Sequence, residues 1–242
     1  MTDYIPPSEP NEFGLPIGLP VSDWKAAKTP QRDVLAGRFC RVEGLSADLH
    51  ADDLFDGLAL DGEGRNWAYL IARKPRDLES FRAWIAEIAA QKDPLFYAII
   101  DLATGKAVGM ASYMRINPPH GVIEVGSILY TPLLQRKPAA TEAMYLMMRH
   151  VFEDLGYRRY EWKCNALNGP SRRAAERLGF TYEGTFRQNM VVHDRNRDTA
   201  WFSLLDAEWP DCKAALEAWL SPENFDEQGQ QRQSLESLRN QA

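Results

Sequence analysis

The chain has 242 residues, of which 45% are hydrophobic, and it carries a net charge of -6 at pH 7. This length allows one large or two small domains with an ample core, and the acidic balance argues against a nucleic-acid backbone as the partner. Cys40, Cys164 and Cys212 have no metal-ligand spacing, and their odd number disfavours a secreted disulfide scaffold. The first ten residues do not resemble a signal peptide, and no apolar run approaches the roughly 20 residues of a membrane span. We therefore expect a soluble, cytoplasmic protein that binds neither nucleic acid, nor membranes, nor a metal.

The first half of the chain changes from an arm to helices and then to strands. Residues 1–36 are rich in proline and glycine, which predicts an extended arm. A short alternating strand over 39–43 and a helix capped by Ser46 follow. Apolar spacing predicts a second helix over 77–91, and the period then changes from 3.6 to 2, which predicts a β-hairpin over 95–114.

Residues 121–149 combine a strand, a loop and a helix. The strand covers 122–130 and contains one carboxylate, Glu124, and the basic loop 131–137 leads into a helix that begins at Pro138. The first N–H groups of such a helix are free and lie at the positive end of its dipole. The pattern therefore predicts an anion site at this helix N-terminus.

The rest of the chain alternates again between strands and helices. Gly156 ends the long helix, a strand covers 159–164, and a short helix begins at Asn168. Two strands, 180–192 and 199–205, are joined by a polar turn over 193–198. The predicted units are an arm at 1–36, one α/β domain at 37–206, and a C-terminal helix with a loosely held polar tail at 207–242.

Three segments, in this order, resemble motifs of the GNAT superfamily of acetyl-CoA-dependent N-acetyltransferases. Residues 135–143 (QRKPAATEA) stand where the family has its pyrophosphate loop, residues 168–171 (NGPS) are similar to N-x-x-S, and residues 177–184 (RLGFTYEG) are similar to K-L-G-F-x-x-E-G. Together they look like the branch that contains the ribosomal-protein N-terminal acetyltransferases. The resemblance covers roughly 37–206 and implies an α/β (α+β) fold, with a mixed, mostly antiparallel sheet and helices on both faces.

The resemblance also implies which residues hold acetyl-CoA, the acetyl donor. They are Leu129, Tyr130, Thr131, Gln135, Arg136, Lys137, Pro138, Ala139, Ala140, Thr141, Asn168 and Ser171. Pro138 and Ala140 replace glycines of the family pattern, but proline is tolerated at the first position of a helix. The alternative is an ordinary strand–helix turn with solvated basic residues.

Glu124 and Ser171 are the candidate catalytic residues. An alkyl amine has a pKa near 10, so acetyl transfer at neutral pH needs a base, and Glu124 is the only carboxylate on its strand. Glu124 is either this base or a carboxylate paired with a nearby Arg or Lys. By resemblance Ser171 stabilises or protonates the departing thiolate, whereas its alternative role, and that of Asn168, is helix capping. The tyrosine that acts as the acid in many relatives is replaced by Ala175. Resemblance also places a carbonyl-polarising N–H near 129–131.

The acceptor is expected to be a primary amine, either a protein N-terminus or a small molecule. An acidic protein suits a small or cationic acceptor, whereas Arg187, Arg195 and Arg197 either bind an acidic acceptor or belong to a solvated hairpin. Some relatives have a second carboxylate where Asn189 and Met190 stand here. Trp67 and Tyr69 either form a wall of the acceptor pocket or pack in the core. A homodimer is compatible with the family, and the alternative function is a non-catalytic acyl-CoA-binding or interaction module.

Overall fold

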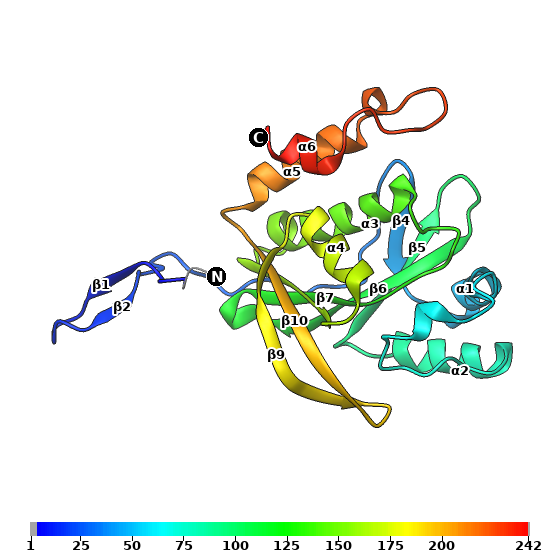
Figure 1. Cartoon of the computed structure of the whole chain (residues 1–242), viewed down its shortest axis with the longest axis horizontal. Coiled ribbons are helices and arrows are strands. Elements are labelled where there is room, and N and C mark those ends of the chain that lie inside the picture. Colours follow the sequence, from blue (N-terminus) through cyan, green and yellow to red (C-terminus); the bar gives the residue numbers. More distant parts are fainter. Residues whose placement is uncertain (1–3, 242) are drawn as a thin grey trace.

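An eight-stranded sheet forms the centre of the computed structural model, which describes residues 4–241 (Figure 1). Residues 1–3 of the predicted arm and residue 242 of the predicted tail lie outside the described part. The strand order is β3-β4-β5-β6-β7-β8-β10-β9, and β7 and β8 are the only parallel neighbours within these residues. The strands are β3 (Leu35–Ala36), β4 (Cys40–Gly44), β5 (Leu95–Asp101), β6 (Ala107–Asn117), β7 (Val122–Tyr130), β8 (Arg159–Asn165), β9 (Thr181–Val192) and β10 (Arg195–Leu205). The expected mixed, mostly antiparallel sheet is confirmed.

Helices cover both faces of this sheet, as expected (Figure 1). On one face α1 and α2 enclose a smaller core with β5 and β6, and on the other α3, α4 and α5 enclose a larger one. The helices are α1 (Ala47–Ala59), α2 (Leu78–Ala89), α3 (Pro138–Arg149), α4 (Gly169–Arg177), α5 (Trp209–Leu220) and α6 (Leu235–Arg239), with a π-helical turn at His150–Asp154. Short 3-10 turns lie at Arg65–Trp67, Pro118–His120 and Pro222–Asn224. Among the described residues, no helix has the length and apolar character needed to cross a membrane.

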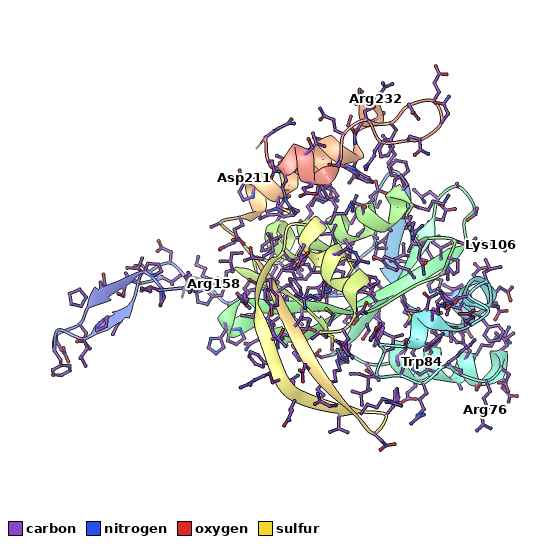
Figure 2. The ribbon with its side chains drawn as sticks, viewed as in Figure 1. Arg76, Trp84, Lys106, Arg158, Asp211 and Arg232 are labelled. Carbon is purple, nitrogen blue, oxygen red and sulfur yellow. The ribbon has the colours of Figure 1, made fainter. Side chains whose placement is uncertain are left out.

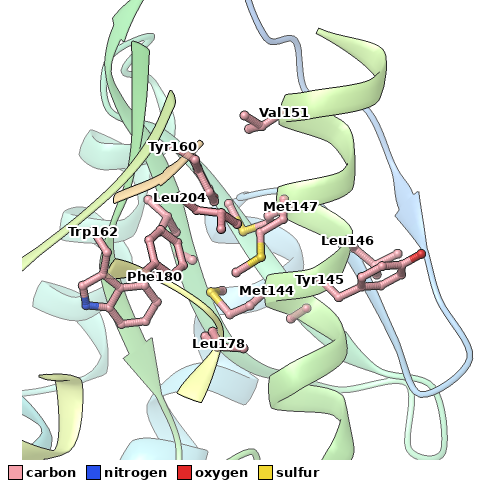
Figure 3. Packing of buried hydrophobic residues seen from close by; sticks show 14 of the residues in the cluster. Met144, Tyr145, Leu146, Met147, Val151, Tyr160, Trp162, Leu178, Phe180 and Leu204 are labelled. Atoms are coloured by element: carbon pink, nitrogen blue, oxygen red, sulfur yellow. The ribbon is translucent and has the colours of Figure 1, made fainter. Parts of the chain in front are cut away.

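The buried face of α3 packs on the centre of the sheet. Met147 points toward Leu204 and Met144 points toward Phe180, whereas Tyr145 lies on another side of the helix (Figure 3). Met147 and Tyr160 are completely buried. The methionines of this helix therefore fill the core, as their helical spacing predicted. This packing holds the N-terminus of α3 against the end of β7.

The two parallel strands separate halfway along their length. β7 pairs with β8 from Val122 to Val125 only, where Val125 lies opposite Trp162. Beyond that point β7 has a bulge against β6, and Ser127 adopts a positive φ of 50°. A bulge bends a strand and increases its twist. β7 therefore turns away from β8 and leaves an opening in the sheet.

The hairpin of β9 and β10 is longer than its sequence suggested. The predicted turn over 193–198 is wrong, because the turn consists of His193 and Asp194, with φ of 52° and 61°, and β10 begins at Arg195. Two adjacent residues with positive φ make the tight turn that suits a twisted hairpin. The polar run 195–198 lacks the apolar alternation of a half-buried strand, yet it pairs with β9. The difference places Arg197 on a strand instead of in a solvated loop.

The N-terminal arm projects away from the body of the protein, whereas the C-terminal tail packs against it. In the arm, a small hairpin of β1 (Ser8–Pro10) and β2 (Pro16–Gly18) projects away from the body, and its side chains are exposed (Figures 1 and 2). The tail was predicted to be loosely held, and this is wrong. Leu235 on α6 is 1% exposed against α5, and Arg239 donates hydrogen bonds to the carbonyls of Glu176 and Arg177. A few apolar residues, Phe225, Leu235 and Leu238, together with these polar contacts, anchor a segment whose composition is polar.

Candidate active site

A cleft of about 790 Å³ lies where β7 and β8 separate. Its walls come from the segment 65–72, from β7 over 124–128, from β8 over 162–165, from the N-terminus of α4, and from the β9–β10 hairpin. Every segment except 65–72 belongs to the sheet or to a helix that packs on it. The opening of the sheet thus brings side chains from distant parts of the chain into one cavity.

Glu124 lines this cleft and is 3% exposed. Its Oε2 accepts a hydrogen bond from Arg115 Nη1 at 2.7 Å and lies 2.9 Å from Lys163 Nζ. Burial raises the pKa of the Glu124 carboxyl above its usual range, although Lys163 and Arg115 each act to lower it. The predicted pairing with a nearby Arg or Lys is therefore present, and the same carboxylate lines the cleft.

Lys163 joins Glu124 to a second buried carboxylate. Its side chain is 5% exposed, and its Nζ donates to Glu161 Oε2 at 2.6 Å. The same ammonium lies 3.8 Å from the centre of the Trp201 ring, which favours a cation. A buried charge needs such partners, because an unpaired one is strongly disfavoured. Lys163 is consequently fixed in place beside Glu124.

Ser171 and Asn168 line the cleft from the start of α4. Asn168 is the N-cap, because its Oδ1 accepts a hydrogen bond from the backbone N–H of Ser171 at 3.1 Å. The capping role that the sequence allowed therefore belongs to Asn168. The hydroxyl of Ser171 has a different partner: its Oγ accepts a hydrogen bond from Trp162 Nε1 at 3.0 Å. An indole N–H donates only, so the hydroxyl of Ser171 can still donate its own proton, and the Cys164 sulfur lies within its reach.

The loop before α3 leads to a helix N-terminus suited to an anion. Pro138 is the first residue of the helix, after Lys137 in the extended N-cap position, as the tolerance of proline there predicted. Within the loop Lys137 donates to the Leu134 carbonyl, and Ala140 donates to the Lys137 carbonyl. The exposed side chains of Arg136 and Lys137 lie beside this helix N-terminus. Two cationic side chains at the positive end of a helix dipole are groups that could hold an anion.

Of the predicted cofactor residues at the end of β7 and in the loop, Gln135 lines the cleft, whereas Leu129, Tyr130 and Thr131 do not. Gln135 lines it and donates to Asn66 Oδ1 and to the Tyr130 carbonyl. Leu129 packs in the core beside α1 and α2, and the N–H and the hydroxyl of Thr131 both donate to the Val108 carbonyl. Thr131 therefore has no free N–H with which to polarise a carbonyl. The β7 backbone that faces the opening is that of residues 126–128, upstream of the predicted position.

Other predicted contacts of the loop are structural. Thr141 is buried, and its Oγ1 accepts a hydrogen bond from Arg177 Nη1 at 3.0 Å. The carbonyl of Ala139 accepts a weak hydrogen bond from the Cys40 thiol, and Ala139 itself is buried. These contacts hold the first turn of α3 against β4 and α4.

Several cleft residues escaped the sequence interpretation. The cleft is also lined by Arg115, Trp162 and Lys163. Each lies on a strand, and the sequence alone does not say which face of the sheet its side chain is on. Tyr69 lines the cleft and donates to the Leu167 carbonyl at 3.2 Å, whereas Trp67 is buried against Trp84. Within residues 4–241, no cluster of His, Cys, Asp and Glu side chains could hold a metal ion.

Known proteins share this architecture and parts of this sequence. Residues 42–181 match the model of the GNAT acetyltransferase domain. The chain is 24% identical over 135 residues to YokL, an uncharacterized prophage-derived N-acetyltransferase of Bacillus subtilis, a match that covers 56% of this chain and 75% of YokL. A GCN5-related N-acetyltransferase structure from Brucella melitensis is 50% identical, with a TM-score of 0.89, over 91% of this chain and 100% of that one. The structure of RimL, a ribosomal L7/L12 alpha-N-protein acetyltransferase, is 17% identical over 72% of this chain and 94% of that one, and its TM-score of 0.61 shows a common fold. This chain belongs to the GNAT acetyltransferase family.

Proposed function

We propose that this chain transfers the acetyl group of acetyl-CoA to a primary amine, by direct attack within a ternary complex. The observation that carries the proposal is that Glu124 and Ser171 line one cleft at the opening between β7 and β8. One is a buried carboxylate, and the other is a hydroxyl that accepts from Trp162 and can donate its own proton. Amine acetylation requires both kinds of group, because a proton must leave the amine and the departing sulfur must be stabilised.

Glu124 is the proposed base. An unperturbed amine is almost fully protonated at neutral pH, because its pKa is near 10. A carboxylate whose pKa lies above its usual range is a stronger base than an exposed one, and burial has this effect on Glu124. Lys163 and Arg115 hold the carboxylate in one position. From there Glu124 would take the proton of the amine, either directly or through a water.

Ser171 is the proposed partner of the departing sulfur. Its Oγ accepts from Trp162, which leaves the hydroxyl as a donor, and a hydrogen bond from this hydroxyl would stabilise the thiolate. Acetyl-CoA itself supplies the activated acyl group as a thioester. The backbone of residues 126–128 borders the opening and is the proposed source of the N–H that polarises the carbonyl. Arg136, Lys137 and the first turn of α3 are the proposed diphosphate contacts.

Turnover and its pH dependence test this assignment. Release of the CoA thiol is followed with a panel of peptide and small-molecule amines, for the unaltered chain and for Glu124→Gln. General-base catalysis typically contributes about 10²- to 10⁴-fold, so we expect a loss of about 10²-fold at pH 7. The loss should shrink as pH rises, because free amine becomes more abundant without a base.

A matched control separates catalysis from damage to the ion pairs. Glu161→Gln removes a carboxylate bound to the same Lys163, but Glu161 does not line the cleft. It should lower turnover much less than Glu124→Gln does. Equal losses, or a Glu124→Gln profile parallel to that of the unaltered chain, would reject Glu124 as the base. Tight binding of acetyl-CoA without turnover of any amine would favour the alternative, a non-catalytic acyl-CoA-binding module.

The proposal also covers which residues form the catalytic domain and in which compartment the protein works. We assign the activity to residues 37–206, because every cleft residue named above lies in this range. The acceptor is a peptide N-terminus or a small molecule, and a homodimer is compatible with either. We also propose a cytoplasmic location, because all three cysteines are buried free thiols, as a reducing compartment allows.

A further inference from the structure

Charged side chains of β6, β7, β8 and β9 form one connected chain of ion pairs across the sheet, beside the point where β7 and β8 separate. The pairs are Arg115–Glu124 at 2.7 Å, Lys163–Glu124 at 2.9 Å, Lys163–Glu161 at 2.6 Å, Arg159–Glu161 at 2.8 Å and Arg159–Glu183 at 2.6 Å. Three cations and three carboxylates take part. The chain of ion pairs therefore contributes no net charge to the cleft that it borders.

Arg197 stands outside this chain of ion pairs. It lines the cleft from β10, and within residues 4–241 no carboxylate forms an ion pair with its guanidinium. Its Nε is shielded from solvent and has no hydrogen-bond acceptor. The adjacent carboxylate of Asp198 is engaged elsewhere, since it accepts from the Gln188 N–H at 2.7 Å and from Asn196 Nδ2 at 2.9 Å. Arg197 is thus the surplus cation of the cleft.

The environment of Arg197 disfavours an isolated charge. The side chain is half-buried, and this burial lowers the pKa of its guanidinium, while Cys164 and Glu124 act in the opposite direction. A partly desolvated donor without an acceptor is unfavourable until a ligand supplies one. Arg187 and Arg195 on the same hairpin are exposed and do not line the cleft. Only Arg197, of these three arginines, therefore has the position of a ligand-binding group.

We propose that Arg197 binds an anionic group of the acceptor, so that the acceptor is a primary amine whose own molecule carries a carboxylate. This inference rests on the proposed N-acetyltransferase function. The amine would face Glu124 and the carboxylate would face Arg197, since both side chains line the same cleft. A guanidinium matches a carboxylate with two parallel hydrogen bonds. One surplus positive charge also matches the single negative charge of a carboxylate better than the double charge of a phosphate.

The polar neighbours of Arg197 complete the subsite. Asn189 and Thr199 line the same part of the cleft, and Asn189 Nδ2 donates to Thr199 Oγ1 at 3.0 Å. That contact leaves the second N–H of the Asn189 amide and the hydroxyl proton of Thr199 for a ligand. Both are donors, as an anion requires. The local charge therefore points to an anionic acceptor, in contrast to the cationic one that the net charge of -6 suggested.

Paired acceptors test the proposal and separate two sources of the carboxylate. Free serine is compared with serinamide, which lacks the α-carboxylate, and the dipeptide amide Ser-Asp is compared with Ser-Asn, which lacks the side-chain carboxylate. We expect one carboxylate member to exceed its neutral partner at least about 10-fold in kcat/KM, the effect of one hydrogen bond to a charged group. A preference in the first pair identifies a free amino acid, and one in the second pair identifies an acidic peptide.

Three variants test whether Arg197 causes the preference for the acceptor that carries a carboxylate. Arg197→Gln should reduce the ratio within the preferred pair to about one, Arg197→Lys should keep part of it, and the control Arg195→Gln should keep all of it. The affinity for acetyl-CoA, measured by calorimetry, should be the same in all of them and also reports that each variant is folded.

The outcomes distinguish this inference from the function on which it rests. If no amine of either pair releases the CoA thiol, the proposed function and the inference both fail. If the amines react without a preference, or if Arg197→Gln keeps the preference, only the anion subsite is overturned. A weaker affinity for acetyl-CoA in Arg197→Gln would also overturn it, because the guanidinium would then serve the acetyl donor.

Discussion

Replacing Lys163 by methionine tests the buried ion pairs at the centre of the site. Methionine keeps most of the side-chain stem over Trp201 but removes the ammonium that lies between Glu124 and Glu161. Breaking a buried ion pair from one side costs about 3–5 kcal/mol. We expect a loss near 3 kcal/mol at pH 7, because each carboxylate keeps one arginine, Arg115 or Arg159.

The loss of stability in Lys163→Met should depend on pH with a known sign. Without the ammonium, the pKa of Glu124 in the folded state rises further above its unfolded value of about 4.5. The folded protein then binds more protons than the unfolded chain, so its stability falls as pH rises through the window between the two values. The penalty should be small near pH 4 and should grow toward pH 7.

Urea denaturation at several pH values measures this effect, and two variants control it. Arg115→Met removes the other partner of Glu124, but the Arg115 side chain is 52% exposed, so we expect a loss of about 1 kcal/mol or less. Glu124→Gln in the Lys163→Met background should recover part of the stability. In the rate assay, the acid limb of the kcat/KM profile of Lys163→Met should move to higher pH. A loss below about 1 kcal/mol, or one that does not change with pH, would refute this account of the ion pairs.

Two further substitutions examine α4 and the tail. Ser171→Ala should lower kcat about 10-fold, the effect of one hydrogen bond to a charged group, while the affinity for acetyl-CoA stays the same. The free energy of unfolding should fall by about 1–3 kcal/mol, because Trp162 Nε1 loses its acceptor although Asn168 still caps the helix. A loss of stability with unchanged kcat would show that Ser171 is only structural. Leu235→Ala should destabilise the protein by about 2–5 kcal/mol in urea denaturation, because a fully buried leucine is truncated. The exposed Leu167 is its control, and equal small effects of Leu167→Ala and Leu235→Ala would mean that the tail does not pack on α5 in solution.

Local sequence patterns were enough to predict most of the elements. The strand over 122–130 has the predicted bounds, and α2 begins after Asp77, where Asp77 and Ser80 form a capping box. Patterns of this kind depend on contacts within one element and on which of its faces is buried. Two predictions failed where packing decided the outcome. The polar hairpin residues from Arg195 pair across strands, and a few apolar residues, Leu235 among them, anchor a mostly polar tail.

The candidate site was predictable only in part, because the cleft residues on strands depend on a register that the sequence does not give. Glu124, Gln135, Asn168 and Ser171 line the cleft as expected, because the first lies on the strand and the others at or near the helix starts that the motifs marked.

The sequence by itself determined the order of the elements, the helix start at Pro138 and the carboxylate of β7. Only the tertiary structure decided that a bulge near Ser127 separates β7 from β8, and that the register places Lys163 and Arg197 in the resulting cleft. A shift of one residue turns a side chain to the other face of a sheet. The partners of a charged strand residue therefore depend on pairing between strands that are far apart along the chain.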